Sequence, residues 1–154
     1  MFKILNFKDK RIRLFFKNVK VSFNYNILYI IKQMIILMYK NNGIGISSNQ
    51  INCFKNIIIC DVNFKKKKPL IMINPKILIN NKNHTLGMEG CLSIKNFLIS
   101  VLRFDKVYIK YFNIYNKKKK KIFNGIKSRC IQHEIDHLNS KLILDYSKII
   151  FQKL

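Results

Sequence analysis

Hydrophobic residues recur at helical spacing in two parts of the chain. Between residues 26 and 40 the apolar positions follow the 3.6-residue period of an amphipathic helix, and Asn41, Asn42 and Gly43 then favour a C-terminal stop. These apolar positions are Ile27, Ile30, Ile31, Met34, Ile35 and Met38. A second helix is predicted from about Gly125 to Leu138, with Asn124 as its N-cap and Asn139 near its end. A last short helix is expected over residues 146–152.

Between the predicted helices, short apolar runs rich in β-branched residues indicate strands. We expect strands over residues 57–62, 70–74, 98–102 and 107–115. Asn74 and Pro75 are expected to break the second strand, residues 80–85 to form a polar loop, and the lysines at 117–121 to form a turn. The pattern predicts an α+β fold in which a mixed or antiparallel sheet wraps around the helix at 125–138.

Length and composition limit the class of protein. A chain of 154 residues with 49% hydrophobic residues is expected to form a single globular domain over residues 1–154. No apolar run is long enough to cross a bilayer, and the N-terminus lacks the pattern of a secretory signal, so no membrane partner is expected. We therefore expect a cytoplasmic protein whose four cysteines are thiols or metal ligands.

The net charge of +23 allows two interpretations. A strongly basic surface attracts RNA, the ribosome or another anionic surface. The abundance of lysine, isoleucine and asparagine is also what an AT-rich genome encodes, and we favour this second interpretation. A bacterium with an AT-rich, reduced genome is the expected source, with an organelle lumen as the alternative compartment, and no specific nucleic acid is expected as a partner.

The chemistry is indicated by His133-Glu134-Ile135-Asp136-His137. Two histidines four residues apart on a helix point the same way, so that both imidazoles can reach one metal ion. Cys91 could supply a third ligand and leave a position open for water, whose pKa the metal would lower. Glu134 would then act as general base, while the Gln50 amide and the Leu92 backbone N–H could stabilise an oxyanion.

Each of these features alone is weak. A chance HExxH sequence on a helix is not rare, and a lone buried cysteine is more often a packing residue than a ligand. The chain, however, has only two glutamates, Glu89 and Glu134, and each lies in one of the candidate motifs. The joint occurrence of the HExxH sequence and Cys91, with glutamates only in these motifs, favours a catalytic site.

Three motifs in order resemble those of the peptide deformylases. Residues 43–50 (GIGISSNQ) are similar to that family's glycine-rich motif, residues 89–93 (EGCLS) to its cysteine motif, and residues 132–138 (QHEIDHL) to its histidine motif. The likeness extends over nearly the whole chain. It implies removal of the formyl group from the N-terminal formylmethionine of nascent polypeptides, with formate as a product and work near the ribosome exit region.

The resemblance also implies roles for individual residues. It implies one divalent metal held by Cys91, His133 and His137, usually Fe(II) in cells, with Zn(II), Ni(II) or Co(II) possible. It implies Glu134 as the acid and base, and Gln50 with the Leu92 amide as carbonyl stabilisers. The residues expected around the substrate are Ile44, Gly45, Glu89, Ile126, Arg129 and Cys130.

Two other functions remain open at this stage. An HExxH-type metallopeptidase would draw its third ligand from a downstream His or Glu, and neither residue type follows His137. A basic protein that binds the ribosome or RNA, with a vestigial metal site, is the second alternative.

Overall fold

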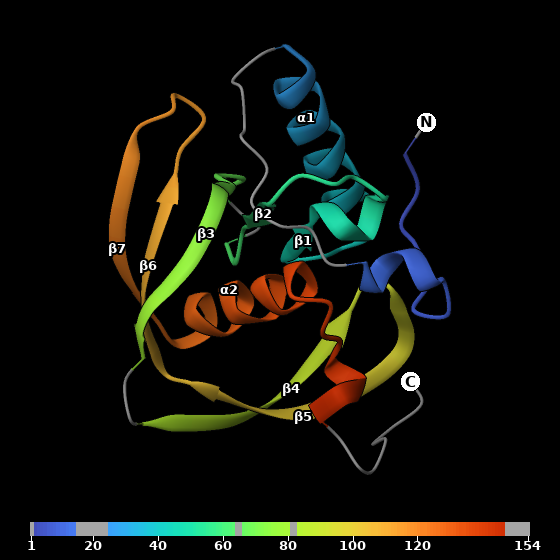
Figure 1. The fold of residues 1–154 in the computed structure, drawn as a ribbon. Helices are drawn as coiled ribbons and strands as arrows, with labels where there is room; N and C mark the ends of the chain where they lie inside the picture. The colour runs from blue at the N-terminus through green and yellow to red at the C-terminus, as the bar shows by residue number, and fades with distance from the viewer. Residues whose placement is uncertain (1, 15–24, 64–65, 81–82, 147–154) are drawn as a thin grey trace.

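The helix that carries both candidate histidine ligands lies at the centre of the molecule. The computed structural model describes residues 2–14, 25–63, 66–80 and 83–146. Within them α2 (Gly125–Leu138) runs between a large sheet and a separate β-hairpin, and α1 (Tyr25–Lys40) packs farther out (Figure 1). Short 3₁₀ helices η1 (Lys10–Arg13), η2 (Ser48–Ile51) and η3 (Ile143–Tyr146) complete the described helical elements.

The strands form two antiparallel sheets. The larger sheet has the order β1-β2-β3-β6-β7, and the smaller one is the β4-β5 hairpin. The strand bounds are β1 Gly45–Ser47, β2 Ile57–Cys60, β3 Leu70–Asn80, β4 His84–Cys91, β5 Ile94–Phe104, β6 Lys106–Phe112 and β7 Lys118–Asn124. Every described pairing is antiparallel, which confirms the predicted α+β class and selects the antiparallel form of the sheet.

Both predicted long helices are confirmed because each carries its own apolar pattern. α1 buries Ile27, Ile31, Met34 and Met38 against the sheet, one turn apart as the spacing requires. α2 instead buries residues on most of its surface, because the two sheets enclose it. Its apolar residues join the core formed with β2, β3, β6 and β7. Its buried polar residues are Ser128, Gln132, His133, Glu134 and His137. Among them Gln132 and His133 bond to residues of the hairpin, whereas Glu134 lies against Gly45 of β1.

The predicted break at Asn74 and Pro75 is wrong. β3 continues through both residues, and its register against β6 shifts between Ile73 and Lys76, as at a β-bulge. Asn74 adopts a positive φ of 50°, a conformation that asparagine accepts more readily than most residues. The bulge accommodates Pro75, so β3 continues past this point instead of ending.

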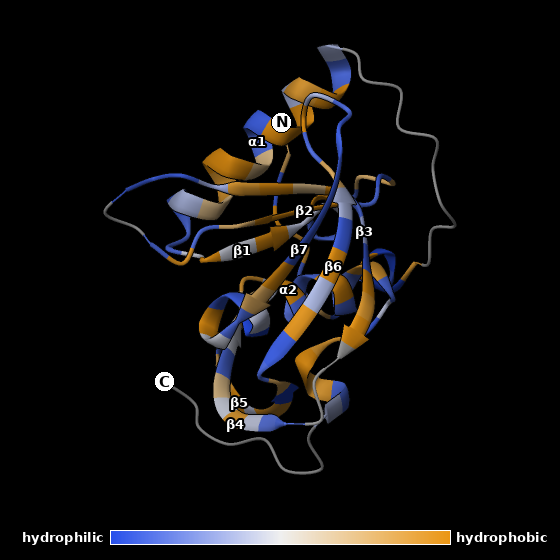
Figure 2. Cartoon of the chain, turned by 90° about the vertical axis from the view of Figure 1, so that its left-hand side faces the viewer, coloured by the Kyte–Doolittle hydropathy of each residue, from blue (hydrophilic) through white to orange (hydrophobic). Residues whose placement is uncertain are grey.

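Two other expectations are also corrected. The loop expected at residues 80–85 overlaps the end of β3 and the start of β4, a strand that the sequence pattern does not predict. The lysines expected in a turn mostly lie in β7, which among the described strands is an edge strand paired with β6 alone. The first five residues of β7 are exposed, and the lysines make much of this strand hydrophilic (Figure 2). η3 ends at Tyr146, and the rest of the helix expected at 146–152 lies outside the described residues.

Among the described residues, no helix has both the length and the apolar character needed to cross a bilayer.

Candidate active site

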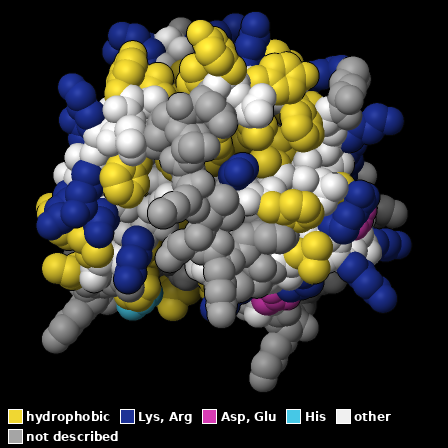
Figure 3. All heavy atoms as spheres, turned by 45° about the horizontal axis from the view of Figure 1, so that its top comes forward, with side chains coloured by type: hydrophobic (Ala, Val, Ile, Leu, Met, Phe, Trp, Pro, Cys, Tyr) yellow, Lys and Arg dark blue, Asp and Glu magenta, His cyan; other side chains and the backbone are white. Residues whose placement is uncertain are grey.

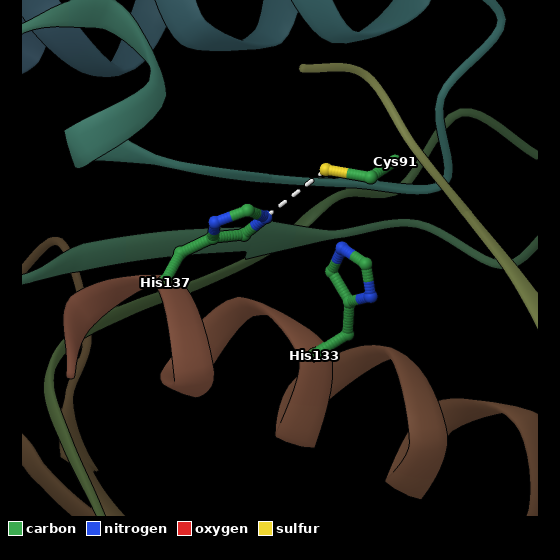
Figure 4. Close-up of side chains that lie close together, drawn as sticks. All are labelled: Cys91, His133 and His137. Carbon is green, nitrogen blue, oxygen red and sulfur yellow. Dashed lines mark hydrogen bonds between the residues drawn. The ribbon is translucent and has the colours of Figure 1, made fainter. Parts of the chain in front are cut away.

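Three candidate ligand atoms converge between the hairpin and α2. The sulfur of Cys91 and the ring nitrogens of His133 and His137 lie within 4.8 Å of one another. The Cys91 Sγ is 3.3 Å from the His137 Nε2. Figure 4 shows both imidazoles rising from α2 towards the Cys91 side chain. The described residues contain this one group of three or more potential ligands at such distances.

The helix fixes the two imidazoles, and the hairpin supplies the sulfur. His133 and His137 are one helical turn apart, and their ring centroids are 5.0 Å apart. Cys91 is the last residue of β4, where the hairpin turns towards β5 and its register shifts. The site therefore joins residues that are more than 40 positions apart in the sequence.

A hydrogen bond with Glu89 fixes the orientation of the candidate ligand His133. The His133 Nδ1 is 3.0 Å from the carboxylate of Glu89. Burial raises the pKa of Glu89, but hydrogen bonds from His133 and Arg103 outweigh it and lower that pKa to about 2. The Glu89 carboxylate is thus ionised and accepts a hydrogen bond from the Nδ1–H of His133, so Nε2 is the ring nitrogen that can face a metal ion, as in many metal sites.

The two histidines differ in their affinity for protons. Burial and the neighbouring His133 lower the pKa of His137 well below its ordinary value, so His137 is a neutral imidazole. Burial also lowers the pKa of His133, but its hydrogen bonds with Cys91 and Glu89 prevail and raise it. A metal ion entering the site would therefore displace a proton from this cluster.

A buried ionic network supports the ligands. Arg103 donates two hydrogen bonds to Glu89, 3.0 and 2.9 Å long, and also forms an ion pair with Asp136. Tyr146 donates to the same Asp136 and packs against the guanidinium of Arg103. Arg103, Asp136 and Tyr146 are absent from the predicted site. The scarcity of arginine in this lysine-rich chain is a signal that could have found Arg103.

Glu134 lies beside the cluster with a free carboxyl oxygen. Its Oε2 is buried and has no hydrogen-bond partner among the described residues. Burial raises its pKa to about 7, although the neighbouring His133 acts in the opposite direction. A Cβ added at Gly45 would collide with the Glu134 carboxylate and lie 2.8 Å from the Cys130 sulfur. Glycine at position 45 therefore allows β1 to approach the helix closely.

Gln50 reaches the site from η2. Its side-chain oxygen accepts a hydrogen bond from the backbone of Ser47 at 2.9 Å, which fixes the orientation of the amide. Its NH₂ group then points to the Ser93 hydroxyl at 3.1 Å and towards the Cys91 sulfur at 3.6 Å. The amide N–H groups are thus directed at the mouth of the ligand cluster.

A cavity of about 550 Å³ opens onto these groups. Its walls include every predicted site residue except His137, whose Nε2 lies 3.3 Å from the Cys91 sulfur. The predicted residues on its walls are Ile44, Gly45, Gln50, Glu89, Cys91, Leu92, Ile126, Arg129, Cys130, His133 and Glu134. The polar side-chain atoms of Glu89 and Arg129, however, form hydrogen bonds with other residues of the protein.

The donor set fits a divalent transition metal. One thiol sulfur and two imidazole nitrogens form the mixed set that suits iron, zinc, cobalt and nickel, whereas calcium and magnesium prefer oxygen ligands. Three protein ligands next to a cavity leave room for a further ligand, as catalytic metal sites require.

Comparison with known proteins decides the family. The model of the family described as polypeptide deformylase matches residues 1–150. The chain belongs to the polypeptide deformylase family. Family membership makes it a metal-dependent hydrolase that removes the formyl group from the N-terminus of nascent peptides, and neither alternative function is favoured.

Bacterial deformylases resemble the chain over almost its whole length. It is 42% identical over 144 residues to a peptide deformylase of Buchnera aphidicola subsp. Cinara cedri, which covers 94% of this chain and 96% of the relative. It is 40% identical over 145 residues to that of Wigglesworthia glossinidia brevipalpis, covering 94% of each chain. The crystal structure of the Thermotoga maritima peptide deformylase superposes with a TM-score of 0.90 at 31% identity, covering 97% of this chain and 99% of that one.

Proposed function

We propose that Cys91, His133 and His137 hold one divalent metal ion, which is Fe(II) in cells. The observation that carries this proposal is the convergence of their three ligand atoms within 4.8 Å at the wall of the cavity. The soft thiolate and the two imidazoles suit Fe(II), and they also accept Zn(II), Ni(II) or Co(II). When bound, the metal supplies Lewis-acid activation of water and of the formyl carbonyl.

Glu134 moves the proton in this proposal. Its partnerless Oε2 accepts a proton from the attacking water and then returns it to the departing amine nitrogen. A pKa of about 7 suits both steps, because the carboxyl group can then exchange its proton near neutral pH. The C–N bond of the formamide breaks, and formate and a free N-terminal amine leave.

Five other predicted residues bind and polarise the formylated methionine. The Gln50 amide and the Leu92 backbone N–H, next to Cys91, are the proposed hydrogen-bond donors to the carbonyl oxygen as it gains negative charge. Ile44, Ile126 and Cys130 give the cavity wall an apolar part that suits a methionine side chain.

The test is metal analysis and formate release on one anaerobically purified sample. Glu134→Ala is expected to keep stoichiometric metal and to lose turnover of formyl-Met peptides. Cys91→Ala is expected to lose the metal, whereas the buried Cys53→Ala, outside the site, should retain it. Unchanged metal content in Cys91→Ala, or wild-type protein that binds metal and releases no formate, would contradict the proposal.

Three broader properties belong to the same proposal. We place the whole chain in one catalytic domain, in the bacterial cytoplasm, acting close to the ribosome exit region. The net charge of +23 supports attraction to the anionic ribosome, and Figure 3 shows Lys and Arg side chains spread over one face with few acidic ones. Co-sedimentation with ribosomes that weakens with added salt tests the last point.

A further inference from the structure

Arg129 connects α2 to both strands of the hairpin. Its guanidinium donates hydrogen bonds to the backbone carbonyls of Thr85 at 2.6 Å and Gly87 at 3.3 Å on β4. It also donates to the carbonyl of Val101 at 2.8 Å on β5. Only 12% of its side chain is exposed. The bonds to Gly87 and Val101 are partly buried, whereas the bond to Thr85 is exposed. A planar fork of donors can join several acceptors in this way, which a lysine ammonium cannot reproduce.

The same guanidinium also reaches the carboxylate that orients His133. Arg129 donates to the Glu89 Oε1 at 2.9 Å, and the Arg103 Nε donates to that same oxygen at 3.0 Å. The Glu89 Oε2 receives the other Arg103 bond and faces the His133 Nδ1. Each oxygen of Glu89 therefore has two partners, so the carboxylate is fixed in position.

Gly87 provides the space in which Arg129 lies. A Cβ added at Gly87 would come within 2.9 Å of the guanidinium carbon of Arg129 and within 3.0 Å of its Nη2. The backbone φ of Gly87 is not in the left-handed region, so the reason for glycine here is space for Arg129. Gly87 is also four residues before Cys91 on the same strand, and a displaced β4 would carry the sulfur with it.

We propose that Arg129 is a positioning residue for the metal site, and that Gly87 is required for Arg129 to occupy its place. Arg129 holds the hairpin against α2 and so sets the distance of the Cys91 sulfur from the two imidazoles. Through Glu89 it also keeps the proton of His133 on Nδ1. This inference rests on the proposed ligand set of Cys91, His133 and His137.

The test uses cobalt-loaded full-length protein. Metal affinity is measured by competition with a chelator, and the thiolate-to-cobalt absorption band reports the sulfur ligand. Arg129→Met is expected to weaken metal binding by about tenfold to hundredfold, as is typical when a group that orients a ligand is removed. Arg129→Lys should lie between Arg129→Met and wild type, because it retains the charge but loses the fork. Arg11→Lys, at an exposed ion pair, is the matched control.

Gly87→Ala makes the test independent of any folding defect in the arginine variants. It should reproduce the weaker binding and the altered absorption band, with a larger fall in kcat than rise in KM. In an Arg129→Lys background the Gly87→Ala change should add less than it does alone, because the two residues act through one contact.

Two results would overturn the inference. The first is that all three single variants keep the absorption band and a metal affinity within about twofold of wild type, which is the ordinary scatter for independent sites. These variants are Arg129→Met, Arg129→Lys and Gly87→Ala. The other is strict additivity in the double variant. A wild type and Arg11→Lys control that bind no cobalt would instead contradict the proposed ligand set.

Discussion

The proposed metal ligands come from two regions that are held in different ways. α2 is buried between the two sheets, and its own helical bonds fix the spacing of His133 and His137. The β4-β5 hairpin pairs only with itself and has exposed apolar side chains such as Leu86, Met88 and Leu102. The relative placement of His133 and His137 follows from helical geometry alone, because the two residues are one turn apart. The position of Cys91 depends on contacts between elements, above all those of Arg103 and Arg129.

The largest expected effect comes from removing the cation at the centre of these contacts. Arg103→Met leaves Glu89 and Asp136 buried without their shared partner, which should cost about 3–5 kcal/mol of the free energy of unfolding. Urea denaturation measures this cost. Arg13→Met, which breaks the exposed pair with Asp145, should cost about 0–1 kcal/mol. Equal losses in the two variants would show that the buried network has no special role in holding the hairpin.

Gly45, which faces α2, should tolerate a methyl group less well than Gly90 in the hairpin. Gly45→Ala places a methyl group against Glu134 and the Cys130 sulfur, so kcat should fall about a hundredfold, the size expected for a misplaced catalytic group. Gly90→Ala meets only the flexible end of Leu98, at 3.3 Å, and should have a smaller effect. Formate release with metal content measured in parallel checks both variants, and the reverse order would refute this comparison.

The smallest expected effect is on how the stability of the fold depends on pH. It involves the ion pair of Arg13 and Asp145, which lies outside both α2 and the hairpin. The hydrogen bond from Arg13 lowers the pKa of Asp145 below its ordinary value of 3.8. A carboxylate whose pKa is lower in the folded state stabilises the fold above its unfolded pKa, and this stabilisation is lost as pH falls through the folded value. Asp145→Asn should therefore unfold slightly more easily at pH 7, and the difference should vanish in strong acid. A difference that grows on acidification would contradict the sign.

The same two regions explain how much the sequence could predict. α1 and α2 were predictable because their apolar residues repeat at helical spacing, and the histidine pair is correctly oriented by that spacing alone. β4 was not predictable, because its sequence HTLGMEGC contains two glycines and little alternation. Its exposed apolar side chains also give no sign of a buried face.

Cys91 was expected beside the histidines because its motif and theirs contain the chain's two glutamates, and because the motifs resemble those of a known family. No local pattern places a strand end beside a helix more than 40 residues later. The support for Glu89 was not predictable from spacing either, since Arg103 and Arg129 lie 14 and 40 residues away from it. Tertiary contacts decide these positions, whereas local sequence decides the helices.

X-ray absorption at the metal edge of the zinc-loaded protein shows whether the Cys91 sulfur and the two imidazoles bind the ion. We expect one sulfur neighbour at about 2.3 Å and nitrogen neighbours at about 2.0–2.1 Å. In the Cys91→Ala variant, any zinc that remains bound should have no sulfur neighbour. A wild-type spectrum with nitrogen and oxygen neighbours and no sulfur would contradict the proposed ligand set.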